Sequence, residues 1–415
     1  MGVKSSKGSG VSRSSSTSSS DIKSPLAAFG ELLTAQLTPV FQNSFEYTVD
    51  NTELTSNAVV NGGSVTQANA MAVCTSSTTT ASTAKLISKQ HAKYRPGMGG
   101  LFRFTALFTT GVATTEQFIG ILDEAGSSES FKNGYAIGMN GTDFSILRFQ
   151  NDVLMAVAQS SFSEDPLDGT GPSGMTIDIT KLNVFEIRFQ YLGAGEIDFL
   201  VENPSTGLFF IFHKIEYSNA YTTPSVYNPN IHATLWVNNK ATTSNIILKS
   251  ASYAYFIEGK NNLQQIQQPE FSSGKRGKGT VTTEVALFTI RNKASYASKS
   301  NFIDIKILYF SIGVEASSAN NLASFRIVRN ATLGGSPSYS DINTSDSVMD
   351  IDTAGTTVTG GKEILQVELA GKNDRALELI EALNIIINPG ETVTVAVSSE
   401  NSATFNGSIL WRELF

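Results

Sequence analysis

The feature that most constrains the fold of this chain is a period of two in its apolar residues, repeated in many short runs. Residues 101–108 are a clear example, because a strand there would place four apolar side chains on one face. These four are Phe102, Phe104, Ala106 and Phe108. Turn signals such as Asn140-Gly141 separate the runs. Many short, turn-punctuated strands predict an all-β protein built as a sandwich or barrel.

The alternation falls into two series, and this predicts two β-domains. We expect the larger sandwich over residues 25–258 and a smaller one over residues 281–415. Residues 259–280 break the pattern with glutamines, Pro269 and a Gly-Lys-Arg-Gly-Lys-Gly run, so they predict a linker. Within the second series, Asp374–Leu383 predicts the one helix, of about two turns.

Residues 1–24 predict a flexible N-terminal arm. Ten of the first twenty residues are serine, and almost nothing there can be buried to offset the entropy of ordering. The simplest interpretation is a flexible terminus, and the alternative is an anchoring arm that threads into a neighbouring subunit, with Lys4, Lys7 and Arg13 as its cations. The start Met1-Gly2-Val3-Lys4-Ser5-Ser6 also matches the N-myristoylation pattern, which leaves a lipid anchor as an alternative.

Composition argues against several classes of function. The net charge of −7 with interspersed signs lacks the basic stripe of a nucleic-acid-binding protein. Cys74 is the single cysteine, so no intrachain disulfide can form. The sequence contains no run of 18 apolar residues, so it predicts no transmembrane helix. It also contains no phosphate-binding glycine loop and no metal-ligand spacing, so it predicts no cofactor.

One strand carries the strongest enzyme-like signal. In Glu196-Ile197-Asp198-Phe199-Leu200-Val201-Glu202, periodicity places Glu196, Asp198 and Glu202 on one face. Paired carboxylates can hydrolyse glycosidic bonds, and the stretch resembles the E-x-D-x-x-E strand of some jelly-roll glucanases, from which it departs by one residue. The alternative is the solvated face of a sandwich strand. With no nucleophile motif elsewhere, we expect the protein not to be an enzyme.

Two acidic turns offer the oxygen ligands that calcium prefers. Asp165 and Asp168 lie in one, and Asp350 and Asp352 lie in the other. The second turn lacks the third ligand of an EF-hand-like loop. Ordinary turn chemistry, in which the carboxylates accept backbone hydrogen bonds, is the alternative at both places.

Several stretches together resemble structural proteins of tailed bacteriophages and other large double-stranded DNA viruses. The stretches are Phe45–Asn51, Ser88–Gly97, Arg188–Gly195, Thr223–Asn230, Asn330–Tyr339 and Asp352–Val358. In this resemblance the first domain is similar to a concanavalin/laminin-G-like jelly-roll sandwich. The second is similar to a sandwich module of fibre-like or capsid- or tail-associated proteins.

The resemblance implies a virion subunit made in the host cytoplasm and contacting other virion proteins. It also implies a homo-oligomer, a trimer in such assemblies, that contributes to attachment to a host-surface glycan or protein. No catalytic residue comes with it. The alternative function is a glycan-binding or glycan-cleaving sandwich protein that is not tied to a particle.

Overall fold

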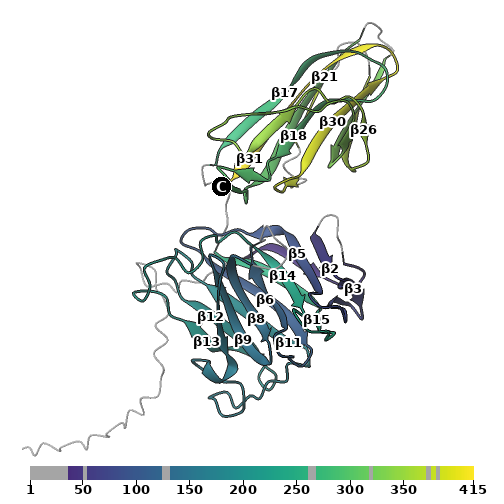
Figure 1. Ribbon diagram of the computed structural model, residues 1–415. Helices are drawn as coiled ribbons and strands as arrows, with labels where there is room; N and C mark the ends of the chain where they lie inside the picture. Colours follow the sequence, from purple (N-terminus) through teal and green to yellow (C-terminus); the bar gives the residue numbers. More distant parts are fainter. Residues whose placement is uncertain are drawn as a thin grey trace, which may run out of the picture.

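A computed structural model describes residues 36–49, 54–123, 131–259, 268–316, 321–370, 375–379 and 384–415. Over these ranges the chain forms β-strands joined by turns, with one short 3-10 turn, η1 (Gln159–Ser161), and the all-β prediction is confirmed. Figure 1 shows two sheeted bodies, one above the other. Lys4, Lys7, Arg13 and the myristoylation pattern lie outside the described residues. Among those described, no helix is long and apolar enough to cross a membrane.

The first body is a sandwich of two antiparallel sheets. The nine-stranded sheet contains β1 (Leu37–Ser44), β3 (Ser64–Ala68), β4 (Met71–Thr75), β6 (Gly99–Phe108), β11 (Asn183–Phe189), β12 (Ile197–Asn203), β13 (Leu208–Ile215), β15 (Ile247–Ser250) and β16 (Ser252–Glu258). The seven-stranded sheet contains β2 (Thr55–Val60), β5 (Thr83–Ala92), β7 (Glu116–Leu122), β8 (Asn133–Asn140), β9 (Asp143–Gln150), β10 (Val153–Ala158) and β14 (Ile231–Asn238). The strand orders are β13-β12-β11-β6-β15-β4-β3, with β16 between β6 and β1, and β10-β9-β8-β7-β14-β5-β2.

The period of two positions the side chains as the sequence predicts. In β6 the four alternate apolar residues are buried in the core between the sheets, while Arg103 and Thr105 face outward. The outer face of the seven-stranded sheet holds a second apolar cluster, in which Phe131 packs against Phe118, Phe149 and Trp236. The seven-stranded sheet therefore buries apolar side chains on both faces, whereas the outer face of the nine-stranded sheet carries polar side chains such as Arg103 and Thr105.

The predicted hairpins are present. Asn140 pairs with Asp143 across Gly141, whose φ of +64° suits the tight turn between β8 and β9. Strands β11 and β12 also pair, with Arg188 opposite Asp198. Turn chemistry in the sequence therefore fixed which neighbouring strands meet.

The second body is also a sandwich with its own core, which is built from residues between Val281 and Trp411. Its five-stranded sheet contains β17 (Glu270–Val281), β21 (Asp304–Ala316), β28 (Arg375–Leu379), β29 (Ile386–Ile387) and β31 (Ala403–Leu414). Its six-stranded sheet contains β18 (Val285–Asn292), β22 (Leu322–Arg329), β24 (Tyr339–Asp341), β25 (Met349–Asp352), β27 (Lys362–Ala370) and β30 (Thr392–Ser399). Two small ribbons pair β19 (Ser295–Tyr296) with β20 (Lys299–Ser300), and β23 (Thr332–Leu333) with β26 (Val358–Thr359).

Two expectations need correction. Residues 375–379, which the sequence predicts as part of a helix, form strand β28 against β21, because pairing with the open edge of the long strand β21 overrides the high helical propensity of the segment. Half of the predicted linker also forms a strand: residues 270–280 belong to β17, whose irregular pairing with β31 accommodates the glycine-rich run through two register shifts.

Candidate functional site

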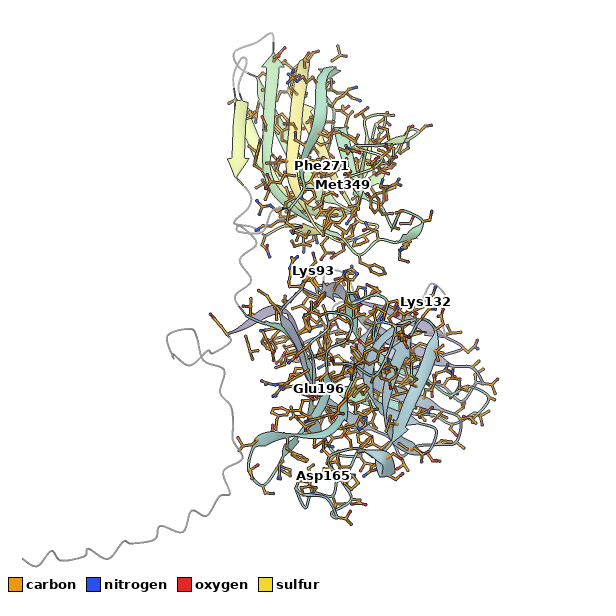
Figure 2. The ribbon with its side chains drawn as sticks, turned by 90° about the vertical axis from the view of Figure 1, so that its left-hand side faces the viewer. Lys93, Lys132, Asp165, Glu196, Phe271 and Met349 are labelled. Carbon is orange, nitrogen blue, oxygen red and sulfur yellow. The ribbon has the colours of Figure 1, made fainter. Side chains whose placement is uncertain are left out.

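The outer face of the nine-stranded sheet gathers the charged side chains that the sequence singled out. Asp198 and Glu202 point outward from β12, while Ile197, Phe199 and Val201 are buried in the core, as the alternation predicts. Glu196 is exposed and directly precedes the strand. Figure 2 labels Glu196 on the first body, well away from the second.

Cross-strand pairing places Asp198 and Glu202 in different rows of this face. Asp198 lies between Arg188 of β11 and Lys214 of β13, whereas Glu202 lies beside Phe209. Four residues along a strand correspond to about 13 Å. The structure therefore brings Glu196 to Asp198 but keeps Glu202 apart from both.

A buried carboxylate that sequence reasoning missed lies in the middle of the face. Glu186 is fully buried, and its Oε2 lies 2.6 Å from the Arg103 Nη2, while its Oε1 pairs with Arg188. Arg103 also stacks over the Phe209 ring, with 5.0 Å to the ring centroid. The missing signal was register, because only strand pairing shows that Glu186 stands directly opposite Arg103.

Asp198 has a perturbed acidity. Burial, followed by the nearby Glu196 carboxylate, raises the pKa of Asp198 to about 6, against the opposing effects of Lys214 and Arg188. Its Oδ1 is buried without a hydrogen-bond partner among the described residues. A carboxyl group of this kind holds a proton far closer to neutral pH than an ordinary aspartate does.

Next to Arg103 the face is hollowed into a groove of ≈ 730 Å³. We call it the polar groove. Its polar lining includes Gln42, Asn43, Arg103 and Thr105, and its apolar and aromatic lining comprises Tyr47, Leu54, Phe104, Val184, Tyr253, Ala254 and Phe256. The amide side chain of Gln67 holds the rim by donating to the main-chain oxygens of Phe45 and Glu46.

Two hydrogen-bonding atoms of the polar groove are left over by the protein. The Asn43 Nδ2 and the Tyr253 hydroxyl are buried, and neither makes a well-formed hydrogen bond within the described ranges. Burial raises the pKa of Tyr253 to about 12, with the neighbouring Asn43 amide opposing the rise. At the rim, the Tyr47 ring is 94% exposed. Buried donors without a partner are costly in a protein interior, and a polar ligand would satisfy them.

The first acidic turn is occupied by backbone donors. The Asp165 carboxylate is buried and accepts from the Leu167 and Ser173 amides, both at 2.8 Å. Asp168 accepts from the amide and the hydroxyl of Thr170. Figure 2 shows Asp165 at the end of the first body that is far from the second.

The second acidic turn is arranged in the same way. Asp350 pairs with Arg291, and Asp352 accepts from the amides of Ser338, Ala354 and Gly355. No cluster of three or more metal-ligating side chains is arranged to hold an ion in the part of the chain that the structure describes. Calcium at either turn stays a prediction.

The histidines and the cysteine have distinct surroundings. Cys74 is buried in the first core, and burial raises the pKa of its thiol to about 12. The His213 Nδ1 accepts from the Ser163 amide. His91 and His232, far apart in sequence, pack ring against ring. The positions of the histidines in the sequence could not predict this contact, because it depends on the pairing of β5 with β14.

Comparison with known proteins gives a likeness of shape only. No family model matches the chain, and no curated protein matches it. Among solved structures it is similar to peanut lectin, with 9% identity and a TM-score of 0.36 over 54% of this chain and 99% of that one. It is also similar to lectin II from Ulex europaeus (10% identity, TM-score 0.35, 53% and 100% covered) and to the catalytic domain of an endo-1,3-β-glucanase from Thermotoga petrophila (12%, 0.35, 55% and 100%).

Likeness at this level carries no residue role or ligand to this chain. Nothing in the comparisons points to a phage or viral origin, so the virion role, the trimer and the location stay predictions from the sequence resemblance.

Proposed function

We propose that the first sandwich is a glycan-binding domain that takes its ligand in the polar groove and does not cleave it. The observation that carries this proposal is the lining of the polar groove, which brings together the buried Asn43 Nδ2 and Tyr253 hydroxyl and the exposed side chain of Tyr47.

The chemistry of the groove suits a polyhydroxylated ligand. The side-chain amides of Gln42 and Asn43 and the Thr105 hydroxyl can both donate to and accept from sugar hydroxyls, and the Arg103 guanidinium can donate to them. Tyr47 adds a flat apolar ring with a polar tip, the type of side chain that binding surfaces favour. Arg103 is held in place by Glu186, so one donor of the groove is oriented before a ligand arrives.

The geometry disfavours hydrolysis. Glycosidases set two carboxyl groups about 5–5.5 or 6.5–9.5 Å apart on opposite sides of the scissile bond. Asp198 and Glu202 are about 13 Å apart along one strand. The Glu186 carboxylate forms ion pairs with both Arg103 and Arg188. The remaining pair, Glu196 and Asp198, lies side by side and interacts directly.

Binding to a glycan array and calorimetry on the best hit test the proposal. Tyr47→Ala should weaken binding about tenfold or more, equivalent to about 1.4 kcal/mol, without loss of stability because the ring is exposed. Tyr227→Ala is the matched control, since Tyr227 is also exposed, at 52%, and lies outside the polar groove. Equal binding by wild type and Tyr47→Ala, or no hit on the array, would overturn the proposal.

Asp198 favours one second candidate, glycan cleavage, because a carboxyl group with a pKa of about 6 can act as a general acid. Assay of released reducing sugar separates the two functions. Release that Asp198→Asn and Glu196→Gln both abolish would establish cleavage. Binding without release would establish a lectin role.

We also retain the virion subunit as a proposal about location, resting on the sequence resemblance alone. Quantitative mass spectrometry of purified particles would test it. A copy number in small multiples of three fits a fibre or tail part, hundreds of copies fit a shell, and absence from particles rejects the proposal. The glycan experiments do not depend on this outcome.

A further inference from the structure

The edge strand β10 of the seven-stranded sheet is built entirely from uncharged apolar residues. It has the sequence Val-Leu-Met-Ala-Val-Ala, and among the described strands it pairs with β9 alone. Val153 is 58% exposed and Leu154 is 37% exposed. An exposed apolar edge strand with unpaired backbone groups is a template for pairing with another strand.

The turn between β9 and β10 determines the hydrogen-bonding register of this pair. Asn151 and Asp152 have φ values of +49° and +68°, and positive φ at both central residues is what a two-residue type I′ turn requires. Gln150 and Val153 pair across the turn, so they form the hydrogen-bonded pair that closes it.

The register shows which backbone groups of β10 are open. Hydrogen-bonded positions alternate along an antiparallel pair, so every second residue of β10 directs its N–H and C=O groups to β9. These residues are Val153, Met155 and Val157. The other three residues direct their groups away from β9, and no strand in the described ranges pairs with them. They are Leu154, Ala156 and Ala158.

Of the β9 residues that pair with β10, Arg148 carries the only charge, and it is buried. Arg148 lies opposite Met155 and donates to the main-chain oxygen of Ser225. Its guanidinium carbon lies over the rings of Tyr217 and Tyr221, at 5.1 Å and 5.6 Å from their centroids. This cation is therefore engaged within the sandwich, and the open edge presents apolar side chains and backbone groups.

Other edge strands carry features that discourage pairing with a further strand. Strand β17 contains Lys275 and Arg276, and β27 contains Lys362 and Glu368. Strand β1 contains Pro39 beside a register shift. Charge, proline and irregular register are the usual protections of an edge, and β10 has none of them.

We propose that β10 is a self-association edge, at which two copies of this chain pair their β10 strands antiparallel about a two-fold axis and join their seven-stranded sheets into one. A second copy fits as the partner because the strand is complementary to itself. With Ala156 opposite Ala156 of the second copy, all three outward-directed residues can form hydrogen-bonded pairs.

The side chains match in the same register. Leu154 would lie beside Ala158 of the second copy, and Met155 would lie beside Val157 of the second copy. A large residue thus meets a small one on one face, apolar residues meet on the other, and no like charges are opposed. Because a two-fold contact uses the same strand of both copies, it predicts a dimer, whereas the sequence resemblance predicts a trimer.

Sedimentation velocity of the full chain over a wide concentration range tests the dimer. The wild type should pass from monomer to dimer as its concentration rises. Ala156→Lys and Ala156→Glu each place two like charges opposite one another at the axis, and each should weaken association about a hundredfold or more. An equimolar mixture of the two variants should associate again, because opposite charges then meet.

Ala58→Lys is the matched control. Ala58 is exposed on β2, the other edge of the same sheet, so this variant should associate like the wild type. Ala156 is also exposed, and circular dichroism checks that its variants stay folded.

A wild type that stays monomeric throughout the range would overturn the proposal, as would a trimer. Association of Ala156→Lys at wild-type strength would show that a different surface joins the copies. A mixture that does not associate would reject the two-fold register. Amide hydrogen exchange at Ala156 should be slow in the dimer and fast in the monomer; protection in the monomer would mean that the same chain covers this edge, which would reject the proposal.

Discussion

At the scale of single residues, close backbone contacts and buried carboxyl groups set the chemistry of the nine-stranded sheet. The turn between β11 and β12 needs a glycine at position 195, because a Cβ there would collide with the carbonyl oxygen of Gln190. The same turn leads Glu196 to Asp198. Gly195 therefore helps to position Asp198, whose pKa is raised on this face.

Gly195→Ala should lower the free energy of unfolding by about 3 kcal/mol, because backbone must move to accept the new methyl group. Gly174→Ala is the comparison. Gly174 has a φ of +64° but open space around it, so only left-handed strain of about 1 kcal/mol is expected. Urea unfolding of both variants measures the difference, and equal losses would contradict the collision.

The raised pKa of Asp198 predicts a pH dependence of opposite sign to the usual aspartate. The folded state holds this proton up to about pH 6, whereas an unfolded aspartate releases it near pH 3.9. Stability contributed by this group should therefore fall as pH rises from about 4 to 6. Asp198→Asn should remove that fall and be more stable than the wild type at pH 7.

Carboxyl NMR titration tests the same point without unfolding. Asp168, whose pKa is lowered mainly by its hydrogen bond to the Thr170 side chain, should titrate below the ordinary range, and Asp198 should titrate near 6. Titration of Asp198 in the ordinary aspartate range would reject its role as a poised acid.

At the scale of strands, alternation and turn chemistry were enough to predict local structure, but not to predict which distant strands pair. The faces of β6 and β12 and the hairpin at Asn140-Gly141 were predictable because each depends on a few neighbouring residues. Strand β28 was not, because it depends on the edge of β21. The prediction of the site was incomplete for the same reason. Asp198 and Glu202 were predictable as outward-facing, but the contacts among Arg103, Glu186 and Arg188 could be found only from the register of the paired strands.

Strand position predicts how the second sandwich tolerates proline. Ser311 in β21 pairs with Leu377 on one side and Ser408 on the other, so Ser311→Pro breaks a central ladder and should cost 3 kcal/mol or more, as a rough figure. Arg276 lies in the edge strand β17, between the paired residues Lys275 and Lys278, and Arg276→Pro should be tolerated. Thermal unfolding and limited proteolysis compare them; equal sensitivity would contradict the strand order.

At the scale of the whole molecule, the described residues form two separate cores. The first core draws on residues up to Ile257 and the second begins at Val281, so each sandwich buries its own apolar surface. Each body also contains one of the two tryptophans: Trp236 lies on the seven-stranded sheet and Trp411 lies in the second core. Fluorescence can therefore follow the two sandwiches one at a time.

Separate cores predict separate unfolding transitions. With Trp236→Phe, fluorescence follows the second sandwich alone, and Phe405→Ala should lower its stability by about 3–5 kcal/mol because Phe405 is fully buried against Phe325. With Trp411→Phe, the same core substitution should shift the first transition only as far as docking couples the bodies. A first transition that does not move would show that the two cores unfold independently. A single transition reported by both tryptophans would mean that the sandwiches unfold as one unit.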